Sequence, residues 1–205
     1  MNAIKKSQLV AVSVCLFAHC CLIPISASAD TTPNNLESAT VESTRSIASQ
    51  LLNSLGQKLK TALSTDGPLA AVSVCKEAAP SIAHSLSAEH GVQITRVGTR
   101  VRNQKMGIPN AWQKEALTQF EERLTLGEKP AELEYWKVVE TANGKRELHY
   151  AKAIAVQPQC LSCHGQAQDI PAALAEKIRQ EYPNDQATGY SAGKLRGAVV
   201  ITKPL

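Results

Sequence analysis

The chain has 205 residues, a length that fits one domain, or one domain with an extension. Its aliphatic content is ordinary and its aromatic residues are few, so the composition argues against a chain that is disordered throughout. The formal net charge of +4 includes two lysines near the N-terminus, without which 20 basic and 18 acidic residues remain. A balance of +2 is too small to indicate a nucleic acid or an acidic membrane as a partner.

The first 29 residues have the layout of a cleavable secretory signal. Lys5 and Lys6 precede an apolar run over residues 9–25, and residues 27–29 read Ala-Ser-Ala, a small-x-small cleavage site. A membrane anchor is the alternative, but the run contains a histidine and a proline and is followed by a good cleavage site. We therefore expect a signal peptide at 1–29 and export to the periplasm, without stable membrane insertion of the mature chain.

Two long helices are predicted in the N-terminal half. From Val41 onwards apolar residues recur every four positions, until Asp66-Gly67-Pro68 stops the helix. A second helical stretch covers about residues 69–89 and ends at Gly91, and Pro80 inside it is expected to kink or divide it. The first apolar stripe comprises Ile47, Leu51, Leu55, Leu59 and Leu63, and the second comprises Val72, Cys75, Ala79, Ile82 and Leu86.

The rest of the pattern predicts an antiparallel sheet with further helices. Strands are expected at 92–97, 133–141, 147–156 and 195–202, and helices at 110–127 and 171–182. Asn143-Gly144, between the second and third strands, is a strong hairpin signal. The sum is an α+β domain over residues 30–205, with N-terminal helices and a cysteine motif at 160–164 inserted before the last strand.

Residues 160–164 read Cys-Leu-Ser-Cys-His, a Cys-x-x-Cys-His motif. In c-type haem proteins two such thiols add across the two vinyl groups of haem, and the following histidine is placed beneath the iron. We therefore expect one covalent haem c attached through Cys160 and Cys163, with His164 as proximal ligand and Gly165 leaving room for the macrocycle. A thioredoxin-like pair would not need the histidine. A zinc site would need a fourth ligand at matching spacing, and the sequence has no second Cys-x-x-Cys pair.

The ligand on the other face of the iron remains open at this point. Removal of the signal leaves Cys75 as the one thiol outside the motif, and it lies on an inward-facing stripe. Its position alone slightly favours a buried free cysteine that acts as a small hydrophobe. Met106 is a further candidate, because methionine is the usual partner of histidine in electron-carrying cytochromes c. The remaining candidates are His84, His90 and His149, all expected to be surface residues.

Three arginines lie in the first predicted strand, at 92–97, and in the loop that follows it. Arg96, Arg100 and Arg102 are candidates for pairing with the haem propionates. A solvated basic loop is the equally weighted alternative for each of them.

Three blocks of sequence resemble a known family. The first is Cys75-Lys76-Glu77-Ala78-Ala79-Pro80-Ser81-Ile82-Ala83, and the second is Thr95-Arg96-Val97-Gly98 to Arg102-Asn103, followed by Pro109 and Trp112. The third runs from His149-Tyr150 to the motif and Gly165, with the closing Gly197-Ala198-Val199-Val200. Over most of residues 45–205 the chain resembles the single-haem, PAS-like c-type domain family. That family was first described in cyanobacteria and also forms the extracytoplasmic part of some sensor kinases.

The resemblance implies an antiparallel sheet flanked by helices, with the haem ligated by the motif histidine and by the helix cysteine. Carried over to this sequence, it makes His164 and Cys75 the two axial ligands. Two positions depart from the family pattern, since Gln104 and Ala153 stand where the family usually has proline. The loop near the haem is therefore expected to differ, which bears on Met106 and Arg102.

We expect a redox or electron-transfer protein with a periplasmic redox or signalling partner. A haem-based redox or gas sensor that acts through a partner protein is the alternative from a different class. An enzyme is not expected, because an iron with two protein ligands has no open position and no distal acid–base pair is evident. A thiolate ligand should also lower the reduction potential of the iron.

Overall fold

The computed structural model describes residues 33–205, which lie within one compact unit. The expected signal peptide lies outside the described residues, and the domain boundary at residue 30 stays a prediction. None of the described helices is both long and apolar enough to cross a membrane. The helices are α1 (Pro33–Thr65), α2 (Gly67–Ser73), α3 (Ala79–His90), α4 (Ala111–Thr125), α5 (Leu161–His164) and α6 (Ala172–Glu181). The strands are β1 (Gln93–Gly98), β2 (Glu134–Glu140), β3 (Arg146–Ala155) and β4 (Leu195–Pro204).

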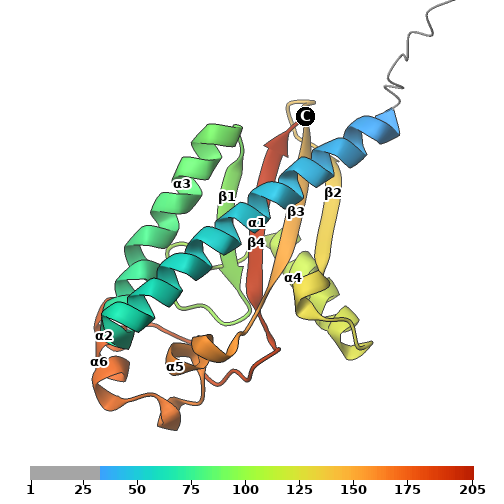
Figure 1. Ribbon diagram of the computed structural model, residues 1–205. Helices are drawn as coiled ribbons and strands as arrows, with labels where there is room; N and C mark the ends of the chain where they lie inside the picture. Colours follow the sequence, from blue (N-terminus) through green and yellow to red (C-terminus); the bar gives the residue numbers. More distant parts are fainter. Residues whose placement is uncertain (1–32) are drawn as a thin grey trace, which may run out of the picture. The chain divides into compact units, whose positions relative to one another are not determined.

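The four strands form one antiparallel sheet in the order β1-β4-β3-β2, so the last strand of the chain lies inside the sheet (Figure 1). β2 and β3 form the predicted hairpin, and Gly144 adopts a left-handed conformation (φ 71°) in its turn. β4 pairs with β3 on one side and with β1 on the other, where Gly98 lies opposite Gly197. The predicted α+β class, a PAS-like antiparallel sheet flanked by N-terminal helices, is confirmed.

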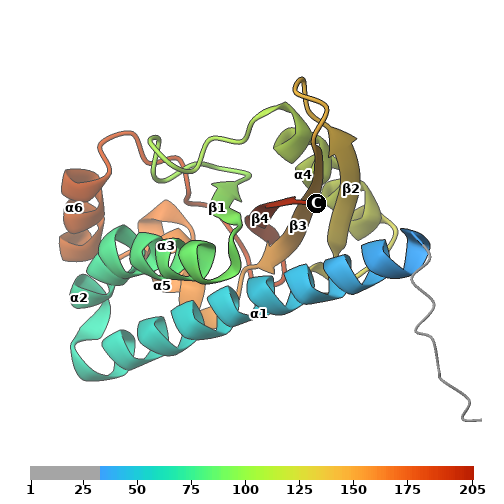
Figure 2. The ribbon, with the colours of Figure 1, turned by 90° about the horizontal axis from the view of Figure 1, so that it is seen from above.

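Helices cover both faces of this sheet, as the views in Figures 1 and 2 show. α1 and α3 pack on one face, and α4 packs on the other. Neighbouring residues of a strand point to opposite faces, so β4 contributes to two cores. Val199 and Ile201 lie in the core that includes α1, whereas Val200 lies in the core that includes α4. A central strand buried on both faces holds the two layers together.

The second face of the sheet accounts for a wrong expectation about His149. Its side chain was expected to be exposed, but it is only 15% exposed and its ring stacks on that of Trp112 in α4, with 4.6 Å between centroids. Asn110 and Gln113 cap α4 through a reciprocal pair of side chain to main chain bonds, which fixes where the helix begins. The alternation in β3 indicated one apolar face, but the packing of α4 over the other face was not visible in it.

The second predicted helix is divided, as Pro80 indicated. α2 is followed by η1 (Val74–Ala78), a π-helical turn, before α3 begins. Pro80 has no N–H for the carbonyl four residues earlier, and the N–H of Ala79 bonds instead to the carbonyl of Val74, five residues back. α1 also differs from expectation, because it begins at Pro33 rather than at Val41. The apolar stripe marks only the part that packs on the sheet.

Candidate functional site

The Cys-x-x-Cys-His motif lies just beyond the end of β3. η3 (Pro158–Cys160), a 3-10 turn, leads into α5, so that Cys160, Cys163 and His164 occupy one short helical segment. Both cysteines are half-buried and free. Cys160 packs against a small apolar cluster of Val156, Ala187 and Tyr190, and Cys163 packs against a cluster that includes residues of α2 and α6. The motif is therefore anchored between the sheet and the two small helices.

Gly165 ends α5, and the structure gives a local reason for glycine at this position. Its N–H donates to the carbonyl of Leu161 at 2.8 Å, and an added Cβ would lie only 2.5 Å from that same carbonyl oxygen. The chain therefore needs glycine here to close its own helical turn. Space for a macrocycle is not required to explain this residue.

The imidazole of His164 is held in one tautomer. Its Nδ1 lies 2.6 Å from the main-chain oxygen of Ala187, and because a carbonyl only accepts, Nδ1 carries the proton and Nε2 keeps its lone pair. Burial lowers the pKa of His164 to about 3, and the nearby charges of Arg102 and Arg196 act in the same direction. The side chain is a neutral imidazole with a free nitrogen, which is the form in which histidine binds a metal.

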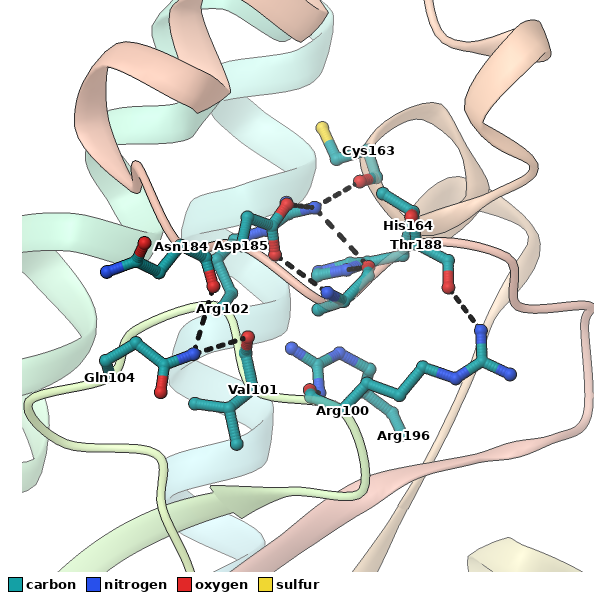
Figure 3. A network of polar contacts seen from close by, with 11 residues as sticks. Arg100, Val101, Arg102, Gln104, Cys163, His164, Asn184, Asp185, Thr188 and Arg196 are labelled. Carbon is teal, nitrogen blue, oxygen red and sulfur yellow. Dashed lines mark hydrogen bonds and ion pairs between the residues drawn. The ribbon is translucent and has the colours of Figure 1, made fainter.

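Arg102 joins the motif to the segment at residues 184–190. Its Nε donates to Asp185 at 3.0 Å, in an ion pair whose side chains are 9% and 10% exposed. Its Nη2 donates to the carbonyl of Cys163 at 2.5 Å and to that of Ala187 at 3.4 Å (Figure 3). The carboxylate of Asp185 in turn accepts the N–H of Ala187 at 2.8 Å. These bonds engage the guanidinium within the protein, so the alternative of a solvated Arg102 is wrong, whereas its pairing with a propionate stays a prediction.

The loop after β1 is bonded to the same segment. Gln104 donates through Nε2 to the carbonyl of Asn184 at 3.0 Å (Figure 3). The N–H of Gln186 donates to the carbonyl of Val101 at 2.9 Å. Gln104 stands where the resembling family usually has proline, and here its side chain makes a bond that proline cannot make. The departure from the family pattern is thus matched by a local contact.

Sequence reasoning missed Tyr190. Its ring meets that of His164 edge-on, with 6.2 Å between centroids, and its main-chain N–H donates to the carbonyl of His164 at 3.0 Å. Its hydroxyl accepts the N–H of Arg100 at 3.0 Å and lies 2.8 Å from the hydroxyl of Thr99. The guanidinium groups of Arg100 and Arg196 lie 5.0 and 5.4 Å from the ring centroid. Because these contacts join distant segments, no local pattern in the sequence signals them.

Cys75 lies close to the motif. It is half-buried in the π-helical turn η1, and π turns in helices are frequent at functional sites. Burial raises the pKa of the thiols of Cys160 and Cys163, and the charge of Cys75 adds to the rise at both. Val72, one turn before Cys75, packs in the same cluster as Cys163. Three thiols and one neutral imidazole therefore gather in a single region.

The other candidate ligands do not share these contacts. Met106 is 51% exposed on the loop after β1, and His84 is exposed on α3. His90 lies at the end of α3, where its Nε2 is buried without a hydrogen bond, and His149 lies against Trp112 in the opposite layer. Within residues 33–205, no three His, Cys, Asp or Glu side chains are grouped so as to hold a bare metal ion.

Two further arginines give the region a positive character. Burial lowers the pKa of Arg96, and that of Arg196 as well. Arg196 donates to the carbonyl of Arg100 at 2.9 Å. For Arg96, by contrast, no hydrogen bond or ion pair is found within the part of the chain that the structure describes. Asp185, already paired with Arg102, is the acidic side chain of this network.

Fold and site together define a small α+β domain whose Cys-x-x-Cys-His motif follows an antiparallel strand and lies near the cysteine of a π-helical turn. The chain belongs to the Tll0287-like family, because the model of that family matches residues 29–204. It is also similar to the crystal structure of the cyanobacterial haem-protein Tll0287, with a TM-score of 0.56 and 25% sequence identity. That similarity covers 84% of this chain and 96% of the other. No curated protein matches the chain.

Proposed function

We propose that the protein binds one haem covalently as a c-type haem protein and serves in electron transfer in the periplasm. Membership of the Tll0287-like family and similarity to a cyanobacterial haem-protein support haem binding. The observation that carries the proposal is the bond from His164 Nδ1 to the carbonyl of Ala187, next to two free thiols. It leaves Nε2 of a neutral imidazole available to an iron atom.

The donor set fits a c-type haem. Cys160 and Cys163 are free and three residues apart, so each thiol can add its S–H across one vinyl group, forming a thioether with no leaving group. His164 is then the proximal ligand, oriented by Ala187 and by the edge of Tyr190. When bound, the haem supplies a one-electron iron couple. The protein residues hold it, orient the imidazole and set the charge around it.

Cys75 is the distal ligand in this proposal. Support comes from its position near both motif cysteines, which the other candidates lack. An iron held by a histidine and a cysteinate has no open position, so we propose no enzymatic turnover. Because a thiolate gives electron density to the iron, the reduction potential should be low.

A haem-based sensor is the second candidate, and one observation favours it. Cys75 lies in a π-helical turn, where the regular hydrogen bonds of the helix are interrupted. A ligand on an irregular turn can leave the iron with little disturbance of the flanking helices. Two coordination states of the iron would then be available for a partner protein to distinguish.

Covalent attachment is tested by extracting the purified holoprotein with acidified organic solvent. We expect the haem to stay on the wild-type chain. The double variant Cys160→Ala/Cys163→Ala should yield chain without attached haem, because no thioether can form. Ser162→Ala is the matched control, since it changes an exposed residue between the two cysteines and keeps both thiols. Release of haem from the wild-type chain would refute the c-type assignment.

Export is tested by fractionating cells and sequencing the N-terminus of the purified protein. We expect a chain that begins at Asp30 in the soluble periplasmic fraction, because residues 27–29 form a cleavage site. Recovery of a chain that still begins at Met1 in the membrane fraction would show that the segment is an anchor.

A further inference from the structure

Arg96 occupies a distinctive place in β1. Successive residues of a strand alternate between its two faces, so Arg96 shares a face with Ile94, which packs in the core formed by α1 and α3. Its side chain therefore points to the layer of α3, not to that of α4. It is half-buried there.

The helix next to this face leads directly to Cys75. α3 and β1 are joined by a tight turn at Gly91 and lie side by side in Figures 1 and 2. The N–H of Ile94 donates to the hydroxyl of Ser87 at 3.1 Å, which sets the register between them. Because the two elements run in opposite directions, each step along β1 moves back along α3 toward η1. Arg96 lies two residues beyond Ile94, and is therefore nearer than Ile94 to the end of α3 that joins η1, the turn that carries Cys75.

The charge of Arg96 lacks a counterion among residues 33–205. Neither a carboxylate nor a carbonyl accepts from its guanidinium in the part of the chain that the structure describes. Burial lowers its pKa, and the charge of Cys75 is the largest influence in the opposite direction. A partly buried cation without a partner is costly, and an anion bound beside it would offset this cost. Two anions come into question, the cysteine sulfur and a haem propionate.

We propose that Arg96 is the positive partner of the Cys75 sulfur in the haem-bound protein, a positioning residue that acts on the iron through this ligand. The inference rests on the proposed ligation of the iron by Cys75. It is distinct from a role in binding a propionate, which involves the edge of the macrocycle and not the sulfur. The position of Arg96 on the α3 face, directed toward η1, favours the sulfur.

The proposal fixes the sign of an effect on the iron. A cysteine that ligates a metal does so as the thiolate, and a positive charge beside that sulfur reduces the electron density it gives to the iron. The same charge favours the reduced iron by direct electrostatic attraction. Both effects raise the reduction potential above the value that the two ligands alone would set. Removal of the charge should therefore lower the potential.

The test compares midpoint potentials and oxidised spectra of holoprotein variants. Arg96→Gln and Arg96→Met remove the charge in different ways, and both should lower the midpoint potential. Arg96→Lys keeps the charge and should restore most of the wild-type value. Lys105→Gln is the control, because it removes one positive charge from an exposed position on the following loop and should change nothing.

A double-mutant cycle then identifies the anion. In a Cys75→Ala background, the shift caused by Arg96→Gln should become clearly smaller, because the part that acts through the sulfur is gone and only the direct attraction to the iron remains. An equal shift with and without Cys75 would overturn the proposal and point to a propionate. Unchanged potentials in both charge-removing variants, with a thiolate-type spectrum intact, would overturn it while leaving the ligation by Cys75 in place. A wild-type spectrum without thiolate character would refute the ligation itself, and the inference with it.

Discussion

His164 donates its Nδ1–H to the main-chain carbonyl of Ala187, 23 positions further along the chain, at 2.6 Å. The same carbonyl oxygen lies 3.4 Å from Nη2 of Arg102, and the N–H of the same residue bonds to Asp185. The main chain of one residue, Ala187, thus connects the motif histidine with a buried ion pair. The orientation of the imidazole depends on residues that precede and follow the motif by many positions, and this dependence can be tested.

Loss of the carboxylate at Asp185 should destabilise the protein strongly. Asp185→Asn leaves the guanidinium of Arg102 buried without its counterion, and removal of one partner of a buried pair costs about 3–5 kcal/mol. Denaturant unfolding of the holoprotein measures this free energy. Glu128→Gln is the matched control, since it breaks the exposed pair with Arg123 and should change stability little. Equal effects of the two substitutions would show that the Arg102–Asp185 pair has no special structural role.

The ion pair between Arg45 of α1 and Glu134 of β2 should make the free energy of unfolding depend on pH in the acid range. Hydrogen bonds from Arg45 are the main cause that lowers the pKa of Glu134 below its usual 4.5, and the hydroxyl of Tyr150 also donates to this carboxylate at 2.9 Å. A carboxyl whose folded pKa is depressed stabilises the folded state above its unfolded pKa, and this contribution is lost as the pH falls through the folded pKa.

Arg45→Gln should therefore be less stable than wild type at pH 7, and the two should converge as the pH falls below about 4.5. Unfolding free energies measured between pH 7 and pH 3 provide the comparison. Arg179→Gln breaks an exposed ion pair within α6 and is the control. Its free energy of unfolding should differ from that of wild type by the same small amount at every pH. A constant difference between Arg45→Gln and wild type would argue against a depressed pKa at Glu134.

Two glycines should respond in opposite ways to substitution by alanine. Gly165→Ala places a Cβ 2.5 Å from the carbonyl oxygen of Leu161, so the turn that ends α5 must shift and the yield of covalent holoprotein should fall. Gly56→Ala lies in the interior of α1 with no heavy atom within 4 Å, and should stabilise the protein by about 0.5–1 kcal/mol. Haem content per chain and unfolding free energy are measured for both. Normal haem content in Gly165→Ala would show that the motif tolerates the shift.

The sequence predicted those parts of the site that depend on local spacing. The Cys-x-x-Cys-His motif, the division of the helix at Pro80 and the inward position of Cys75 all follow from residues close together in the chain. The contacts that orient His164 do not, because Ala187 acts through its main chain and any residue there would present the same carbonyl. Arg102 was misjudged for a related reason, since its partner Asp185 is 83 positions away.

In the fold, too, features set by neighbouring residues were predicted, and contacts between distant segments were not. Strand positions followed from alternation and from the Asn-Gly turn, but the pattern in β3 did not reveal that α4 covers the face of His149. The face of β3 that carries His149 contains polar residues and was therefore predicted to be exposed to solvent. In the structure, the ring of Trp112 packs against it. Tyr190 escaped notice because an isolated aromatic in a loop carries no periodic signal.

The most direct test of the proposed haem site compares wild-type holoprotein with Cys75→Ala. Wild type should be low-spin when oxidised, with a thiolate-type spectrum and a low midpoint potential. Cys75→Ala should lose the thiolate signature, become high-spin or take water, shift to a higher potential and bind carbon monoxide more readily when reduced. Met106→Leu is the control, because Met106 is exposed and should leave all these properties unchanged. If Cys75→Ala keeps the wild-type spectrum and potential, Cys75 is only a packed thiol, and the proposed ligation of the iron is wrong.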